Sequence, residues 1–444
     1  MGAIVLAVAL VLGHGAGSAA AQGLTLAEAI GRALERSPLL AAAGHERARA
    51  AAGVDRARAA FFPRLDTGYG YTRSDQPVYA FGSKLNQGRF TETDFDVDRL
   101  NSPGAIDNFR GAVTLRQPLY TGGKTTLGLE QAETARRIAA LESERATQEI
   151  IFQVVRAYLA LRLAQERLAA ADASVKAGES NQALAQSRVR AGQAVESDLL
   201  AAEVRLARLR EDALAARSRV GVAQTALNHA MGTPLDVPLE ATDPLTLRPA
   251  GGEPPPARDV LAQRPDYHAL ELTEEARGRE VRLARAEFLP TVSAEASYEV
   301  NQARAFGDGQ GSWTVMALLQ WNLFQGGAVR ARIREAEAVR DRARALRERA
   351  ASQIGLEVRE ARARLDTARE RAAVAERAIA QAEEALRIVG SRYRGGLATV
   401  VDLLGAEAAL TDARLRLSEA LFDQNLGLAA WELALGRLRR DTLR

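Results

Sequence analysis

A strand-like segment that ends in two glycines and passes directly into a long helical pattern occurs twice in this 444-residue chain. The first copy reads Gln-Pro-Leu-Tyr-Thr-Gly-Gly at 117–123, and the second reads Gln-Trp-Asn-Leu-Phe-Gln-Gly-Gly at 320–327. The two glycine pairs are 204 residues apart. Internal repeats constrain a fold strongly, because each copy is one supersecondary unit. The sequence therefore predicts two equivalent halves, each built around one change from strand to helix.

The two halves have the same order of elements around the glycine pair. Two runs of period-two alternation precede each pair, which predicts one β-hairpin at about 64–120 and another at about 290–323. A proline-free helical pattern follows each pair and turns 69 residues later, at Gly192 and at Gly395-Gly396. Such a helix is roughly 100 Å long. Equal lengths predict two long helical hairpins, at about 124–230 and 327–438, whose tips lie at the same level.

The remaining segments complete this organisation. Residues 1–21 are typical of a secretory signal, with an apolar run too short to span a bilayer and small residues before Gln22. The first repeat then spans 22–230 and opens with a helix from Leu24 to Phe62 that is broken at Pro38. Residues 231–257 hold seven of the fourteen prolines and are interpreted as a linker, the equatorial region. The second repeat spans 258–438, and 439–444 form a tail.

Composition excludes several classes of protein. Basic and acidic residues number 59 and 56 and interleave along the chain, which indicates a solvated helix surface and no nucleic-acid partner. The chain has no cysteine, so disulfides, cysteine-ligated metals and an acylated N-terminal cysteine are excluded. The four histidines are scattered, and no phosphate loop or nucleophile elbow is present. We therefore expect no catalytic residues, no cofactor and no metal.

Strand geometry favours a membrane barrel built from several chains. No apolar stretch reaches the roughly 18 residues of a membrane helix, so any membrane crossing must use strands. Each predicted strand approaches the roughly 9–11 residues that cross a bilayer when tilted. Four strands cannot close alone, and an open sheet edge is not tolerated in lipid. A dimer would give eight strands, packed shut by side chains, whereas a trimer would give twelve and leave room for a lumen.

The two faces of the predicted strands differ in polarity, and aromatic residues mark their ends. One face is apolar or aromatic and the other polar, which is the lipid-out, water-in alternation of a membrane barrel. The polar face carries Asp66, Arg110, Arg116, Glu295 and Glu299. The junctions between helices and strands contain Pro63, Gly122, Gly123, Pro290, Gly326 and Gly327. They also carry Phe61, Phe62, Tyr120, Phe288, Trp321 and Phe324. We interpret these aromatics as an interfacial belt, although they would also suit the core of a soluble sandwich.

Together these motifs resemble the TolC-like outer membrane efflux family. The Phe-Phe-Pro and Phe-Leu-Pro turns, the two Gly-Gly junctions and the Gly-x5-Asp-Leu-Leu tips carry the resemblance, in order and in duplicate, over essentially the whole mature chain. It implies a mixed α and β membrane protein: a homotrimer with a twelve-stranded outer-membrane β-barrel, four strands per chain. This barrel would be continuous with a long periplasmic α-helical coiled-coil barrel. Many family members have an acylated N-terminal cysteine; this chain has none, so we predict no lipid anchor.

The same resemblance implies a function. The chain would be the exit duct of a tripartite efflux system, passively conducting small molecules such as drugs, toxic compounds or metals. Its partners would be outer membrane lipid, a periplasmic adaptor and an inner-membrane pump of the resistance-nodulation-division or ABC type. The second hypothesis is that the chain is the outer-membrane component of a type I protein secretion system. The third is that it is a structural coiled-coil surface protein. The cargo stays open, because specificity lies mainly in the inner-membrane partner.

The candidate gate lies at the two helical tips. Asp198 and Asp402 match family positions near the closed periplasmic end, and threefold symmetry would turn each into an acidic ring that favours cations. The alternative is helix capping, because both residues follow a turn and the helix dipole stabilises an acid there. The resemblance adds Tyr393 and Arg394 as latch partners for Asp198.

Overall fold

The computed structural model describes residues 22–249 and 252–442. The predicted signal segment 1–21 lies outside the described residues, as do 250–251 of the linker and 443–444 of the tail. The described residues form two compact units. The helical unit comprises the residues up to Ala43, Ser143–Pro265 and those from Ala351 onward, and the sheet unit comprises Gly44–Glu142 and Asp266–Ala350. None of the described helices is long and apolar enough to cross a membrane.

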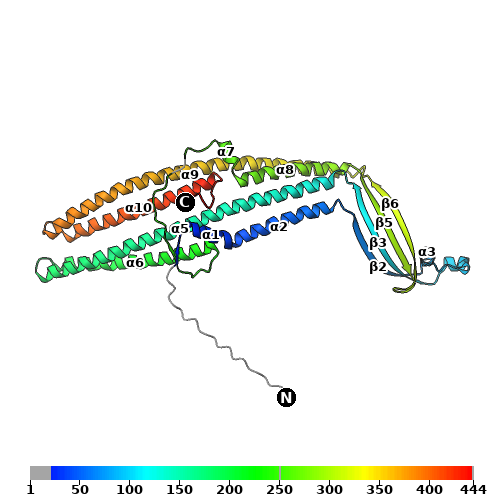
Figure 1. The fold of residues 1–444 in the computed structure, drawn as a ribbon, viewed down its shortest axis with the longest axis horizontal. Helices are drawn as coiled ribbons and strands as arrows, with labels where there is room; N and C mark the ends of the chain where they lie inside the picture. Colours follow the sequence, from blue (N-terminus) through cyan, green and yellow to red (C-terminus); the bar gives the residue numbers. More distant parts are fainter. Residues whose placement is uncertain (1–21, 250–251, 443–444) are drawn as a thin grey trace, which may run out of the picture. The chain divides into compact units, whose positions relative to one another are not determined.

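Four antiparallel strands form the sheet of the sheet unit, in the order β2-β3-β5-β6 (Figure 1). The first hairpin consists of β2 (Arg64–Ser74) and β3 (Ile106–Tyr120), and the second of β5 (Thr291–Gln302) and β6 (Gly309–Gln320). The hairpins join through β3 and β5, and a β-bulge lies between Pro118 and Tyr120. Each half of the chain therefore contributes one hairpin to a single sheet, and β2 and β6 are its edges.

The register separates the polar and apolar residues of the strands onto opposite faces. Arg110 lies opposite Asn301, and Arg116 lies opposite Glu295, and directly opposed residues share a face. Arg116 forms an ion pair of 2.8 Å with Glu295, and Arg110 forms another with Glu299. The other face carries exposed apolar side chains, among them Leu65, Tyr69, Tyr298, Trp313 and Val315. On edge strand β6, Met316 and Leu318 are exceptions because they lie on the polar face.

The helices of the sheet unit lead into and out of these strands. Helix α2 (Pro38–Ala59) precedes β2, and helix α8 (Pro265–Arg285) with the short η2 (Ala286–Phe288) precedes β5. The first turns of α5 (Lys124–Arg190) and α9 (Ala328–Arg394) leave the sheet after β3 and β6. Cross-helix ion pairs join α8 to both of these helices, through Arg279 to Glu130 at 3.1 Å and through Glu274 to Arg347 at 3.2 Å.

The loop of the first hairpin is folded. Residues 75–105, called the insertion below, contain α3 (Pro77–Asn86), η1 (Glu92–Phe95) and α4 (Val97–Asn101). The sequence predicts only a long polar loop here, because its glycines, aspartates and asparagines are typical of loops. The corresponding loop between β5 and β6, residues 303–308, has no such element.

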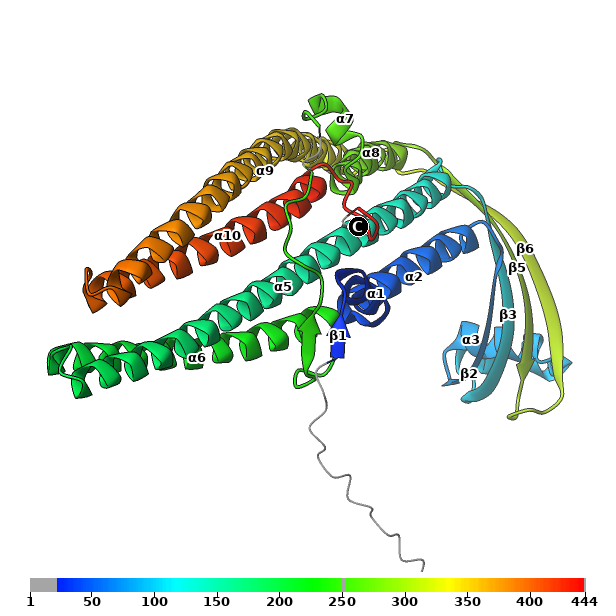
Figure 2. The same ribbon diagram turned by 60° about the vertical axis from the view of Figure 1, so that its left-hand side comes forward.

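Two long helical hairpins dominate the helical unit. Helices α5 and α9 have 67 residues each, and they turn back as α6 (Glu196–Met231) and α10 (Val400–Ala434). Figure 2 shows α6 alongside the end of α5, and α10 alongside the end of α9. The identical lengths follow from the identical spacing between glycine pair and tip in the two repeats. The unit also contains α1 (Leu26–Arg36) and the short α7 (Ala257–Leu261).

The predicted helix start at Leu24 is wrong, because this residue belongs to a strand. Strand β1 (Gln22–Leu24) pairs in parallel with β4 (Leu239–Ala241), which lies within the proline-rich linker. Helix α1 begins only after Thr25, whose side chain forms a capping box with Glu28. The same helical segment ends at Ala59, three residues before the predicted end at Phe62.

Buried polar groups fix this part of the linker to the helices. The Tyr158 hydroxyl donates to the Leu24 carbonyl at 2.9 Å and accepts the backbone N–H of Asp243 at 3.0 Å. Burial raises the pKa of Tyr158 to about 12, so the hydroxyl keeps its proton. Gln424 holds both the N–H and the carbonyl of Arg248. Because a buried polar group without a partner is costly, these contacts specify the path of the linker.

Candidate gate at the helical tips

Each helical tip is a tight turn with one glycine in the left-handed region. Gly192 has a φ of +68° and Gly396 a φ of +73°. Beyond them, the N–H of Gln193 returns to the Arg188 carbonyl and the N–H of Leu397 to the Arg392 carbonyl, each at 2.8 Å. Such bonds close the end of a helix and require a residue that tolerates positive φ. Gly395, also expected in the second tip, lies in that turn without a positive φ.

Asp402 completes a capping box with Thr399, the N-cap residue of helix α10. Its carboxylate accepts hydrogen bonds from the backbone N–H and the hydroxyl of Thr399, at 2.9 and 2.7 Å. The Thr399 hydroxyl oxygen in turn accepts the N–H of Asp402 at 3.2 Å. The bonds from Thr399, with a smaller contribution from the charge of Arg392, hold the pKa of Asp402 below its usual value. Within a single chain, Asp402 therefore acts in helix capping, as the alternative interpretation expects. The acidic ring that three copies would form stays a prediction.

Asp198 occupies the same position in the first repeat but lacks the capping partner. Val195 stands where the second repeat has Thr399, and it makes no side-chain cap. The backbone N–H of Asp198 still bonds to the Val195 carbonyl at 3.0 Å. Within residues 22–249 and 252–442, the half-buried Asp198 carboxylate accepts no hydrogen bond. The Asp198 carboxylate therefore takes no part in closing the start of α6, unlike that of Asp402 at the start of α10.

The latch predicted between Asp198 and the second tip is not formed in this chain. No hydrogen bond or ion pair within the described part of the chain joins Asp198 to Tyr393 or Arg394. Instead the Arg188 guanidinium lies over the Tyr393 ring, 4.4 Å from its centroid. Arg188 also donates to the Tyr393 and Arg394 carbonyls at 3.2 and 3.4 Å. Arg188 thus links the two hairpins of one chain at the level of the tips. Farther from the tips, the Asn181 side chain donates to the Glu407 carboxylate at 2.8 Å and Arg167 pairs with Glu419.

Tyr393 is placed by a small apolar cluster at the second tip. It is 7% exposed and belongs to a cluster with Val400 and Leu403. The repeat spacing aligns Tyr393 with Val189, directly after Arg188, so the two partners of the link come to the same level of their hairpins. Arg188 was not predicted, because the repeat alignment gives the level of its contact along the hairpins but not which faces of the two hairpins meet.

The predicted junction residues lie at the ends of the strands. All four junction glycines have positive φ, between +58° and +85°, which explains why glycine is required there. Pro63 and Pro290 each directly precede a strand. The six junction aromatics are between 44% and 87% exposed in the single chain. Trp321 also donates its indole N–H to the Phe288 carbonyl at 2.9 Å, so two of these aromatics are held together.

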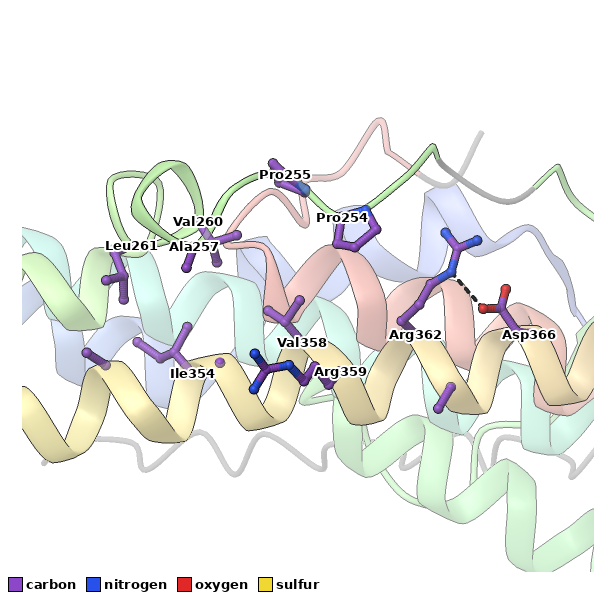
Figure 3. Close-up of a pocket in the computed structure, with 13 residues that line it drawn as sticks. Pro254, Pro255, Ala257, Val260, Leu261, Ile354, Val358, Arg359, Arg362 and Asp366 are labelled. Atoms are coloured by element: carbon purple, nitrogen blue, oxygen red, sulfur yellow. Dashed lines mark hydrogen bonds and ion pairs between the residues drawn. The ribbon is translucent and has the colours of Figure 1, made fainter.

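An apolar cavity in the helical unit offers no catalytic arrangement. It has a volume of about 430 Å³ and lies between 254–261 and helix α9, where Val260 and Leu261 approach Ile354 and Val358 (Figure 3). Its charged lining includes Arg362 and Asp366, which pair at 2.8 Å. No cluster that would hold a metal ion occurs among the described residues.

Comparison with known proteins identifies the family. The model of the family "Outer membrane efflux protein" matches residues 29–233 and again 257–437. The proteases secretion protein PrtF of Dickeya chrysanthemi is 26% identical over 430 residues, covering 95% of this chain and 89% of that protein. The toluene efflux pump outer membrane protein TtgF of Pseudomonas putida is 25% identical over 289 residues, covering 64% and 56%.

A solved structure shows the same fold. The CmeC outer membrane channel of Campylobacter jejuni superposes with a TM-score of 0.80 at 17% identity, covering 94% of this chain and 86% of that one. The predicted TolC-like fold, with two repeats, long helical hairpins and four strands per chain, is confirmed. The chain belongs to the outer membrane efflux protein family, and it is a non-enzymatic channel of the Gram-negative outer membrane with a periplasmic helical domain.

Proposed function

We propose that three copies of this chain form the exit duct of a tripartite efflux system. The duct passively carries small molecules from an inner-membrane pump and a periplasmic adaptor to the exterior. The observation that carries this proposal is the four-stranded sheet, with one polar face, one apolar face and two unpaired edges. An unpaired strand edge in lipid leaves backbone groups unsatisfied, at several kcal/mol each.

Pairing β6 of one copy with β2 of the next removes these edges. Three copies then give twelve strands, which enclose a lumen, whereas two copies give eight strands and a filled interior. The apolar face with its exposed tyrosines, tryptophan and valines contacts lipid. The polar face, with the Arg110–Glu299 and Arg116–Glu295 pairs, lines the water-filled lumen. A structural coiled-coil protein has no need of such a two-faced sheet.

The tips provide the regulated end of the duct. Arg188 ties the two hairpins of one chain together through Tyr393, and the acidic rings of Asp198 and Asp402 line the narrow passage that the helical tips enclose. Opening at this end requires the hairpins to separate, and an adaptor that binds the tips would favour the open arrangement. The pump would be of the resistance-nodulation-division or ABC type.

Small-molecule efflux is our first choice of cargo, and type I protein secretion is the second candidate. The likeness to TtgF, whose name states toluene efflux, supports the first. The likeness to PrtF supports the second, because it extends over nearly the whole of both chains.

Two measurements test this proposal. Purified protein in detergent is expected to run as a heat-modifiable trimer and to form channels in planar bilayers. A deletion strain is expected to become sensitive to dyes, antibiotics or metals, and complementation should restore resistance. A monomer that forms no channel would contradict the duct. A deletion strain with normal resistance that fails to export a large protein would favour the secretion function.

A further inference from the structure

The insertion at residues 75–105 is attached to the polar face of the sheet. It lies at the strand ends remote from the glycine junctions, where Figure 1 places α3. Gln87, just after α3, donates from its amide to the Asp107 carbonyl at 2.8 Å and to the Asn108 side chain at 3.0 Å. Asn108 donates in turn to the Asn301 side chain at 2.9 Å. By register, Asn108 and Asn301 lie on the same face as Arg110.

These three amides form a buried network. Gln87, Asn108 and Asn301 are only 6%, 5% and 3% exposed, although they belong to a loop and to the polar face of a sheet. Breaking a buried network leaves donors and acceptors unpaired, which costs about 1–3 kcal/mol for each group. The insertion is therefore anchored to strands β3 and β5.

Contact with a third strand comes from Gly88. This residue has a φ of +63°, and a Cβ at this position would collide with the side chain of Gln310 on β6. Gln310 lies opposite Asn301 and hence on the same polar face. The insertion thus reaches from the β2–β3 hairpin over β5 to edge strand β6.

The insertion also has its own small core. Phe90 packs edge-to-face on Phe81 and on Phe95, with ring centroids 4.7 and 5.1 Å apart. Lys84 pairs with Asp94 at 2.7 Å, and this bond, together with bonds from Thr91, lowers the pKa of Asp94 to about 2. A loop that carries aromatic packing and an internal ion pair keeps a defined shape.

We propose that the insertion is a plug in the channel lumen, and that three copies narrow the exit and set the largest solute that can leave. The proposal rests on the proposed function, because it requires the polar face to line the lumen. Twelve strands about 4.8 Å apart and tilted about 40° give a barrel with a backbone diameter of roughly 24 Å. A helix with its side chains is about 10 Å across, so three insertions take up much of the opening.

The plug leaves a polar route beside it. A cavity of about 810 Å³ lies between α3 and the sheet, and its lining includes Gly68, Gly70, Tyr79, Arg110 and Glu299. Small polar or amphipathic solutes fit such a space. A polypeptide passes only if the insertion leaves the polar face, so the plug favours small-molecule cargo.

Labelling from outside the cell tests the plug, because the chain contains no native cysteine. Ser297→Cys places a single thiol on the polar face, opposite Thr114. A small maleimide and a maleimide carrying a wide polyethylene glycol chain are applied to intact cells. The reporter is placed in the full chain, in a variant with 76–104 replaced by a six-residue Gly-Ser turn, and in Gly88→Ala. Gly82→Ala is the matched control, because a Cβ on Gly82 of α3 meets nothing within 4 Å.

We expect the wide reagent to label the shortened-loop variant roughly tenfold faster than the full chain or Gly82→Ala, because pore width limits entry. Gly88→Ala should give a smaller increase, because its positive φ strains an alanine whereas the end of the Gln310 side chain can move aside. Equal labelling of full and shortened chains by the wide reagent would overturn the plug while leaving the duct intact. If the small reagent does not label the thiol of Ser297→Cys in the shortened chain, the polar face does not line the lumen. That result would contradict the proposed function. Trimer yield on gels checks that each variant folds.

Discussion

The two helical tips start from equivalent sequences and end with different chemistry. In both tips an aspartate stands three residues after the N-cap residue of the returning helix. That N-cap residue is Thr399 in the second tip and Val195 in the first. Asp402 therefore completes a capping box, whereas at the first tip the Asp198 N–H donates to the Val195 carbonyl and no side-chain cap forms. The second tip also has the apolar cluster around Tyr393. The hydroxyl group of Thr399 thus decides whether the repeated aspartate takes part in the cap of its helix.

Arg188→Ala is expected to have the largest effect on this pair of tips. It removes the contact with the Tyr393 ring and two hydrogen bonds to backbone carbonyls, which together stabilise the contact between the two tips of one chain by about 2 kcal/mol. In the proposed gate, opening separates these tips. Single-channel recording should therefore show an open probability raised by roughly thirtyfold. The matched control is Arg392→Ala, the equivalent position of the second repeat, which is exposed. If the two substitutions raise the open probability equally, the contact between Arg188 and Tyr393 does not stabilise the tips.

Asp402→Ala should come next in size, because it removes the capping box. The expected loss is about 1 kcal/mol of stability at the start of α10. Hydrogen exchange in the first turn of α10 should accelerate by roughly fivefold, whereas Asp198→Ala should leave the first turn of α6 nearly unchanged. If both substitutions accelerate exchange equally, the contrast between the tips is wrong.

Val195→Thr is expected to give the smallest change and to sharpen the comparison. It supplies the missing hydroxyl and should create a second capping box with Asp198, adding about 0.5 kcal/mol at the first tip. Exchange in the first turn of α6 should slow accordingly. The gain should vanish in the double variant Val195→Thr/Asp198→Ala. A gain that persists without the Asp198 carboxylate would mean that the box does not form.

Local patterns in the sequence predicted most of the fold. The period-two strands, the glycine pairs and the proline-free helices are all set by residues near one another in the chain, and the spacing of 204 residues placed both halves. The parallel pairing of β1 with β4 was missed, because each strand has only three residues and no period to detect. Helix α3 was missed because its formation depends on packing against the polar face of the sheet, which no local pattern shows.

The tips could be predicted only in part. The turns and the two aspartates were visible, and the Thr-x-x-Asp pattern at 399–402 was itself a readable capping signal. The contact between Arg188 and Tyr393 was not visible, because it joins two hairpins whose mutual rotation no local pattern specifies. Whether the aspartates form rings depends on the neighbouring copies.

The reversal potential of single trimers under a salt gradient tests the central claim, that the chain forms a duct whose narrow end is lined by Asp198 and Asp402. Asparagine at either position removes the charge, and at 402 its side-chain oxygen still accepts the bonds from Thr399. We predict that wild-type trimers conduct with a preference for cations, and that Asp198→Asn and Asp402→Asn each reduce it while trimers stay intact. An unchanged reversal potential in both variants would contradict the account.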